Sequence, residues 1–347
     1  MGINGLNHFI NERSNNTFKV VPITETGKSV AIDTTNWLYI PAYEANIRVI
    51  DETDVVSEEL SRISYMRIFK ELVIIFIKMW LENGITPYFI FDGNAPVDKQ
   101  NTRSKRREKT QLIKDNINTL KEEFKGKDRL MISPAKITQM KTYMKQDLYI
   151  STDETRQIKD LIFSFGIPVL QCTEEGEKLC SALAINGIVD AVFSTDTDNL
   201  TYGVPLLINK FVGNERDKHG NWVPSVRIIK CEDVLKALDL TYKEFVDFCI
   251  GCGCDYNDHM SKVGPATIYK LIKQYRSIEN FPSKYNVSCL RVERCRELFT
   301  ITGYEDILKH GNIEPICENY IKYGKPILQR FGCESYIFVF NKFYQIE

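Results

Sequence analysis

Four short runs of apolar and β-branched residues, each followed within a few residues by Asp or Glu, are the feature of this chain that most limits its fold. The runs cover residues 29–32, 88–91, 167–170 and 191–195. Stretches with helical character, such as 66–82 and 174–186, alternate with them and end near glycine. This alternation predicts an α/β fold, with a mainly parallel central sheet flanked by helices.

The acidic residues that follow these strands are the first candidates for a functional site, because ligands gather at the carboxyl ends of parallel strands. One Asp after a strand is an ordinary turn residue, and a Glu at a helix start also interacts favourably with the helix dipole. Several carboxylates at one edge repel each other, however, and a bound cation is the simplest remedy. Oxygen ligands suit Mg²⁺, and paired divalent ions suit phosphodiester hydrolysis. The candidates are Asp33, Asp92, Glu175, Glu177, Asp196, Asp198 and, later in the chain, Asp255.

Charge is unevenly distributed along the chain, although its net charge is only −1. Residues 99–145 hold 14 Lys and Arg against 5 Asp and Glu, whereas the rest of the chain holds 31 against 41. One basic element beside an acidic body suits a protein that grips phosphates in one place and holds metal ions in another. A solvated helical hairpin explains the same composition equally well.

The sequence predicts three regions. A core comprises residues 1–98 and 151–230, and a basic helical insertion comprises 99–150, broken near Gly126 and at Ser133-Pro134. Residues 231–347 are predicted to be mostly helical, with a helix-hairpin-helix-like turn at 263–266, in which Gly264 allows the tight turn. The apolar run 336–340 is predicted to be a buried strand.

Cysteine content and the lack of long apolar stretches indicate the compartment. Ten cysteines without a secretory signal predict reduced thiols in an intracellular, reducing compartment. The cluster Cys249, Cys252 and Cys254 is predicted to be buried thiols rather than a zinc site. The most apolar stretch, 72–81, is too short to span a membrane and contains Lys78.

Six motifs, in order and at similar spacing, carry a resemblance to a known family. They are Met1-Gly2-Ile3-x-Gly5-Leu6, Val30-Ala31-Ile32-Asp33 with Tyr39, Glu82-Asn83-Gly84-Ile85 through Asp92-Gly93, Gly166-Ile167-Pro168 through Glu177, Asp196-x-Asp198 through Gly203, and Gly253-x-Asp255-Tyr256 with Gly264-Pro265. From Gly2 to about residue 280 the chain resembles the flap endonuclease and xeroderma pigmentosum G type of structure-specific 5′-nucleases. This resemblance implies a PIN-like nuclease core, a helical arch at 99–150 and a DNA-binding turn near 264.

The resemblance implies a role for each matching residue. The seven acids would ligate two Mg²⁺ ions, which Mn²⁺ can replace, with Asp92 and Asp196 central to catalysis. Lys99 and Arg106 match the family's basic pair at the scissile phosphate; from the residues alone, each is an exposed surface charge. Further implied DNA contacts are Gly2, Tyr39, Arg103, Lys262, Gly264, Lys270 and Lys273, and K⁺ is implied at the turn.

The expected function is therefore that of a Mg²⁺-dependent flap endonuclease with 5′–3′ exonuclease activity, acting on branched or 5′-ended DNA as a monomer in replication, repair or recombination. The basic segment suits salt-sensitive tracking of a single strand. The chain lacks the Gln-led sliding-clamp motif near its end, so clamp binding is not expected. The expected location is the nucleus, or a cytoplasmic site of replication if the protein is viral. A 5′–3′ exoribonuclease and a non-catalytic DNA-junction-binding protein are the alternatives.

Overall fold

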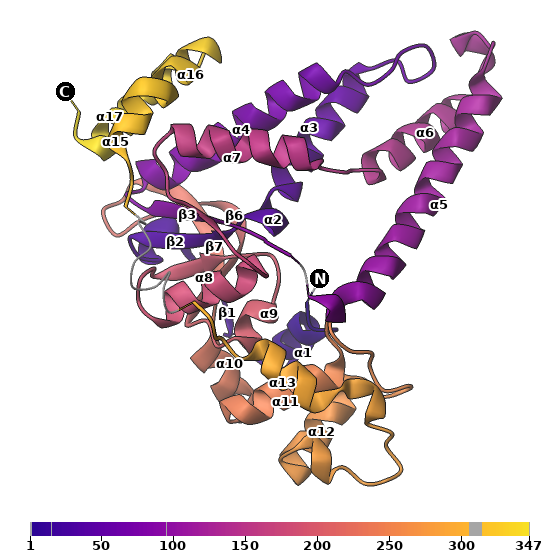
Figure 1. Cartoon of the computed structure of the whole chain (residues 1–347), viewed down its shortest axis with the longest axis vertical. Coiled ribbons are helices and arrows are strands. Elements are labelled where there is room, and N and C mark those ends of the chain that lie inside the picture. Colours follow the sequence, from indigo (N-terminus) through magenta and orange to yellow (C-terminus); the bar gives the residue numbers. More distant parts are fainter. Residues whose placement is uncertain (1, 15, 95, 305–313, 347) are drawn as a thin grey trace. The chain divides into compact units, whose positions relative to one another are not determined.

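The computed structural model describes residues 2–14, 16–94, 96–304 and 314–346, which form two compact units (Figure 1). The sheet unit comprises Met1–Asn36, Trp80–Lys99 and Ile167–Pro315. The helical unit comprises Trp37–Met79, Gln100–Gly166 and Ile316–Glu347. The domain boundaries expected from the sequence stay a prediction.

A seven-stranded sheet forms the centre of the sheet unit, in the order β1-β7-β6-β5-β2-β3-β4. Its four predicted strands are β2 (Ser29–Asp33), β3 (Thr86–Phe91), β4 (Val169–Gln171) and β5 (Ala191–Phe193), and these pair in parallel. β6 (Leu206–Arg216) is parallel to β5, whereas β1 (Phe18–Pro22) and β7 (Trp222–Lys230) add an antiparallel edge. The α/β class is confirmed, and the sheet is mixed.

The central strands are buried because helices cover them. Every residue of β5, and all but the first of β2 and β3, is buried, as continuous apolar runs predict for strands covered on both faces. Helix α8 (Gly176–Ile185) packs against β2, β3 and β5. Helix α10 (Cys231–Leu238) contacts β7 and α1 (Leu6–Arg13). The carboxyl ends of β2, β3 and β5 therefore share one rigid edge.

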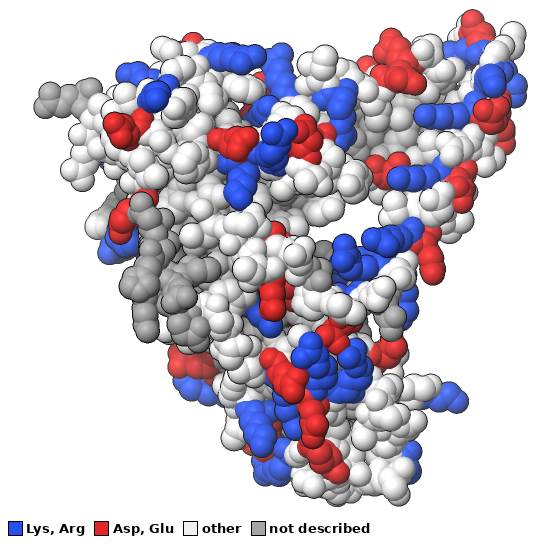
Figure 2. Space-filling view, viewed as in Figure 1, with Lys and Arg blue, Asp and Glu red and all other residues white. Residues whose placement is uncertain are grey.

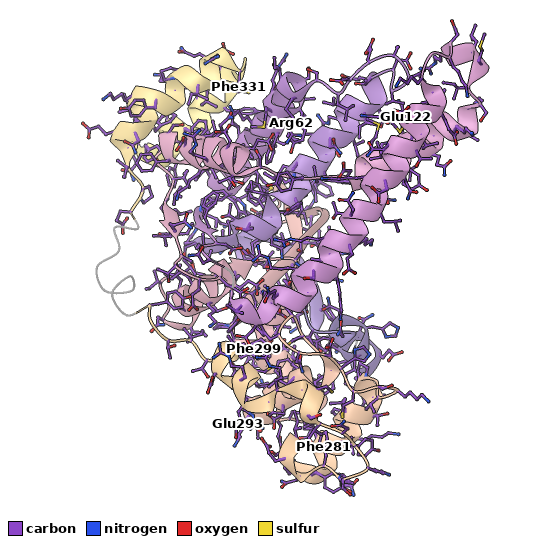
Figure 3. The ribbon with its side chains drawn as sticks, turned by 45° about the vertical axis from the view of Figure 1, so that its right-hand side comes forward. Arg62, Glu122, Phe281, Glu293, Phe299 and Phe331 are labelled. Carbon is purple, nitrogen blue, oxygen red and sulfur yellow. The ribbon has the colours of Figure 1, made fainter. Side chains whose placement is uncertain are left out.

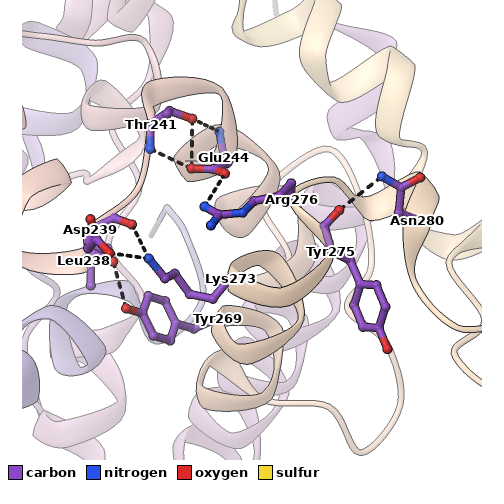
Figure 4. A network of polar contacts seen from close by, with 9 residues as sticks. All are labelled: Leu238, Asp239, Thr241, Glu244, Tyr269, Lys273, Tyr275, Arg276 and Asn280. Carbon is purple, nitrogen blue, oxygen red and sulfur yellow. Dashed lines mark hydrogen bonds and ion pairs between the residues drawn. The ribbon is translucent and has the colours of Figure 1, made fainter.

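Polar contacts tie the later helices of the sheet unit together (Figure 4). Helix α11 (Tyr242–Cys252) begins with a capping box in which Thr241 and Glu244 exchange hydrogen bonds. From α12 (Pro265–Tyr275), Arg276 reaches Glu244 at 3.1 Å, and Tyr269 donates to the Leu238 carbonyl at 2.8 Å. Helix α13 (Val292–Phe299) packs on α11, and the short helices α2 (Thr34–Trp37) and α9 (Asp198–Thr201) flank the sheet edge.

The turn before α12 differs from the sequence expectation. Gly264, the residue before the helix, has φ −98° and ψ 175°, an extended conformation that any residue adopts. The left-handed residue of the turn is Lys262, with φ 61°. The prediction that Gly264 allows the tight turn was wrong, because the chain reverses two residues earlier.

The helical unit contains α3 (Tyr39–Glu52), most of α4 (Arg62–Glu82), α5 (Gln100–Phe124), α6 (Pro134–Gln146) and α7 (Thr152–Ser164). Helices α5 and α6 form a hairpin whose small apolar core also includes Val55, from the segment after α3; its other members are Ile117, Leu120, Phe124, Ile132 and Met140. Ser133 caps α6 and Pro134 opens it, so the predicted break at this pair is confirmed.

The C-terminal segment is helical, with α15 (Cys317–Asn319), η6 (Tyr320–Gly324), α16 (Lys325–Arg330) and α17 (Ile337–Tyr344). The prediction of a buried strand at 336–340 was wrong. Phe340 and Tyr344 both stack on Tyr320. Residues four apart lie on the same face of a helix, so the helical conformation lets both rings contact Tyr320. None of the helices that the structure describes is long and apolar enough to cross a bilayer.

Candidate active site

Acidic side chains from distant parts of the sequence meet at the carboxyl edge of the sheet. Asp33 is the last residue of β2, Asp92 follows β3, and Asp196 and Asp198 follow β5. Glu175 is the residue before α8, and the N–H of Gly176 donates to Asp92 Oδ1 at 2.7 Å. The sheet order β5-β2-β3 thus assembles the predicted residues without a dedicated loop.

Lys99 lies among these carboxylates. Its Nζ is 2.5 Å from Glu175 Oε1 and 3.5 Å from Asp255 Oδ2, and only 13% of its side chain is exposed. Burial alone would lower the pKa of Lys99, but the carboxylates of Glu177, Glu175 and Asp255 outweigh it and raise that pKa. Lys99 is therefore a permanent positive charge inside an acidic group, and its predicted contact with the scissile phosphate stays a prediction.

Several carboxylates of this group are buried more deeply than their charges favour. Burial, followed by the charges of Asp92 and Asp196, raises the pKa of Asp33 to about 7. Burial and neighbouring acids raise the pKa values of Glu177 and Asp198 well above the ordinary range. Within the described residues, Glu177 Oε2 and both carboxylate oxygens of Asp198 are buried without a hydrogen-bond partner. Unpartnered buried acceptors are costly, so this cluster is not explained by folding alone.

The N-terminal motif packs directly on the acids. Gly2 has φ 98°, and a Cβ atom at this position would lie 2.0 Å from Asp196 Oδ1 and 2.9 Å from Thr197 Oγ1. Any larger residue would displace Asp196. Asn4 donates from its backbone to the Gly253 carbonyl at 3.0 Å, which links the same segment to the loop before Asp255. The close approach of the Gly2 backbone to Asp196 explains why glycine stands at position 2.

The donor set fits hard divalent cations, because it consists of carboxylate oxygens with partner-free positions in Asp198 and Glu177. Within the described part of the chain, no three Asp, Glu, His or Cys side chains are close enough together to hold a metal ion. Lys99 is the counter-charge for Glu175 and Asp255 in this arrangement.

Two buried tyrosines, to which the sequence assigned no role, lie next to the acidic group. The Tyr256 hydroxyl donates to Glu175, and the Tyr202 and Tyr256 hydroxyls lie 3.1 Å apart, with both rings buried. The Lys99 ammonium lies 5.2 Å from the centre of the Tyr256 ring. Both tyrosines lie inside matched motifs, Tyr202 just before Gly203 and Tyr256 directly after Asp255, but the motifs gave neither residue a role.

The other predicted contacts lie elsewhere in the fold. Tyr39, Arg103 and Arg106 belong to the helical unit, where the Arg106 charge opposes the burial that raises the pKa of Tyr39. Figure 2 shows Lys and Arg side chains along the α5–α6 hairpin, and Arg103 and Arg106 are exposed there. In the sheet unit, Lys262 and Lys270 are exposed, whereas Lys273 donates to the Asp239 carbonyl at 2.7 Å (Figure 4).

The Cys249, Cys252 and Cys254 thiols are free and buried at the end of α11. They pack with the apolar side chains of the sheet unit's core. This is the arrangement that the sequence predicted for them.

Comparison with known proteins agrees with this geometry. The XPG N-terminal domain matches residues 1–113 and the XPG I-region matches residues 166–255. Flap endonuclease 1 of Cryptosporidium muris is 30% identical over 345 residues, which cover 93% of this chain and 69% of the relative. The flap endonuclease-1 structure from Methanococcus jannaschii aligns with a TM-score of 0.60 at 22% identity, covering 94% and 96% of the two chains. Human GEN1, solved in complex with Holliday junction DNA, aligns with a TM-score of 0.58 at 15% identity, covering 99% and 78%.

The mixed sheet, its acidic edge and these matches define a DNA nuclease, that is, a hydrolase. The chain belongs to the flap endonuclease family of the XPG type, whose members are structure-specific 5′-nucleases. The resemblance found in the sequence is confirmed.

Proposed function

We propose that this protein hydrolyses phosphodiester bonds in branched or 5′-ended DNA at the acidic edge of its sheet, with two Mg²⁺ ions, which Mn²⁺ can replace. The observation that carries the proposal is the set of buried carboxylate oxygens of Asp198 and Glu177 that lack any described partner. Bound divalent ions would neutralise the group, and they supply a hydroxide nucleophile and charge stabilisation at neutral pH. The residues that would hold them are Asp33, Asp92, Glu175, Glu177, Asp196, Asp198 and Asp255.

Lys99 has a second task in this proposal. Its ammonium stays charged beside Glu175 and Asp255, and a long flexible side chain can exchange one carboxylate partner for a phosphate oxygen. A positive charge held at the reacting phosphate stabilises the negative charge that develops there. Arg106, from the helical unit, is the second member of this basic pair.

Recognition of DNA would depend on shape rather than on base sequence. The basic, exposed α5–α6 hairpin provides phosphate contacts such as Arg103, and contacts of this kind position DNA without reading bases. Human GEN1, with the same fold, was solved with Holliday junction DNA, which supports branched DNA as the substrate class here. Lys262 and Lys270 are exposed for further phosphate contacts near the turn before α12.

The test compares cleavage of labelled 5′-flap, nicked and blunt DNA duplexes with 5′-phosphorylated RNA, with and without Mg²⁺. Cleavage of the flap near the junction, only with the ion, is expected. Asp196→Ala should abolish it, because this buried carboxylate is one of the residues that would hold the ions. Glu232→Ala removes an acid on α10 whose side chain is 65% exposed and serves as the control that stays active.

Three outcomes would contradict the proposal. Cleavage without divalent ions would contradict the metal-dependent mechanism. Full activity of the Asp196→Ala variant would show that the acidic group is not the active site. Preference for the RNA substrate would favour an exoribonuclease instead.

A further inference from the structure

Asp98, the residue before Lys99, makes ion pairs that no part of the proposed mechanism uses. Its carboxylate accepts a hydrogen bond from Arg291, and Arg294 donates to its Oδ2 from Nη2 at 2.8 Å and from Nε at 3.2 Å. The Asp98 side chain is 10% exposed, whereas Arg291 and Arg294 are about half exposed. Charge-assisted bonds from two guanidinium groups to one carboxylate are among the stronger polar contacts in proteins.

The same arginines come from an element that already braces the acidic site. Arg291 precedes α13 and also donates from Nη1 to the Tyr256 carbonyl at 3.3 Å. Phe299, at the end of α13, packs edge-on against the Tyr256 ring with the ring centres 5.5 Å apart. Glu293 and Phe299 mark this helix in Figure 3. Helix α13 therefore holds Asp98 and Tyr256 together.

The local backbone points the side chains of Asp98 and Lys99 in different directions. Both lie in the short 3-10 turn η2 (Val97–Lys99), in which successive side chains point roughly 120° apart. With Asp98 fixed toward α13, the Lys99 side chain takes a different direction, in which its Nζ reaches Glu175 and Asp255. The Lys99 N–H closes this turn by donating to the Pro96 carbonyl at 3.1 Å.

We infer that Asp98, gripped by Arg291 and Arg294, is a positioning residue that fixes the backbone of Lys99 so that its ammonium stays over the acidic group. This inference rests on the proposed nuclease function. The three residues act through Lys99 and Tyr256, and none of them contacts the carboxylates of the acidic group in the described structure. Because two arginines bind one carboxylate, the turn that carries Asp98 is held by more than one ion pair.

The test measures single-turnover cleavage of a 5′-flap and hydrogen exchange of the Lys99 amide in DNA-free and metal-free protein. In Asp98→Asn and Asp98→Ala, cleavage is expected to fall roughly 10- to 100-fold while the Kd for DNA stays within about twofold, because a displaced positioning group affects the reacting geometry and not binding. The Lys99 amide should exchange faster. In a Lys99→Ala background, Asp98→Ala should change the rate by less than about twofold, because residues that act as one unit are not additive.

Glu297→Gln is the matched control, since it removes the other carboxylate bound by Arg294, at 3.0 Å, and should leave cleavage unchanged. The inference is overturned if Asp98→Ala slows the Lys99→Ala protein as much as wild type, or if weaker DNA binding accounts for the whole loss. Faster cleavage would also overturn it, because it would mean that the freed arginines serve the DNA instead. If wild type itself cleaves no flap, the proposed function fails. Exchange of the Lys99 amide in Asp98→Asn still tests whether Asp98 fixes the backbone of Lys99.

Discussion

The acidic edge of the sheet unit and the α5–α6 hairpin of the helical unit are both dense in charge, but they carry it in opposite ways. Asp33 and Asp198 are 2% and 1% exposed, whereas Arg103 and Lys109 lie on an exposed helix surface. Charge that is buried among like charges costs stability, and charge in solvent costs little. Under the proposed function, the buried acids would serve chemistry at a cost in stability, whereas each exposed basic residue is expected to contribute separately to DNA binding.

Removing one buried acid is expected to produce the largest effect. Asp198→Asn should lower single-turnover cleavage by about 1,000-fold or more, since it removes several kcal/mol of transition-state stabilisation. The same substitution relieves repulsion, so the metal-free protein should unfold at a higher temperature than wild type. Quenched-flow cleavage and calorimetry in chelator measure the two effects. An Asp198→Asn variant that stays active and is less stable than wild type would contradict the view that this buried acid costs stability and serves cleavage.

Removing the buried positive charge should have the opposite effect on stability. Lys99→Met should slow cleavage by roughly 100-fold and destabilise the metal-free protein by about 3 kcal/mol, because Glu175 is left as a buried charge without its ion pair. Divalent ions should restore part of the lost stability. Lys236→Met, on the 73% exposed Lys236 of α10, is the control and should change neither property. Equal melting temperatures for wild type and Lys99→Met in chelator would count against the account.

A single substitution on the exposed hairpin is expected to have a moderate effect on binding and none on folding. Arg103→Ala should weaken DNA binding a few-fold and reduce the slope of log Kd against log salt by about 1, because one phosphate contact is lost. Fluorescence anisotropy over a salt series measures this slope. An unchanged slope would show that Arg103 does not contact phosphate, and a large loss of thermal stability would contradict the view that this surface is structurally neutral.

The smallest effect concerns acid stability of the hairpin. A hydrogen bond from Lys136 lowers the pKa of Glu123, so the pair stabilises the fold above the ordinary Glu pKa of 4.5 and is lost as the pH falls through the lowered value. The melting temperature of wild type should therefore drop slightly more between pH 7 and pH 3 than that of Glu123→Gln. Because the Glu123 side chain is 40% exposed and solvent screens the pair, the difference should be close to the limit of calorimetric detection. A steep difference would show that the exposed charges are not neutral to folding.

The sequence predicted the site better than its surroundings. Each predicted strand was followed within a few residues by an acid, and the carboxyl ends of parallel strands share one edge, so the convergence of Asp33, Asp92 and Asp196 was predictable. The strand order β5-β2-β3 was not. Strand β6 and the antiparallel edge formed by β1 and β7 were not predicted, because none of the four runs followed by acids lies in them.

Long-range partners could not be predicted at all. Asp98 and Arg294 are 196 residues apart, and neither lies in a motif that links them. The five consecutive apolar residues 336–340 fit the period of a strand and that of a helix, and only packing on Tyr320 decides for the helix α17. Tertiary contacts, rather than local preference, determine both features.

Binding of Mn²⁺ to the DNA-free protein, measured by isothermal titration calorimetry, tests most directly whether the buried acids form a cation site. Wild type should bind two ions per chain, and Asp198→Asn should bind fewer and more weakly, while Glu232→Ala matches wild type. Absence of binding to wild type, or unchanged binding to Asp198→Asn, would contradict the account.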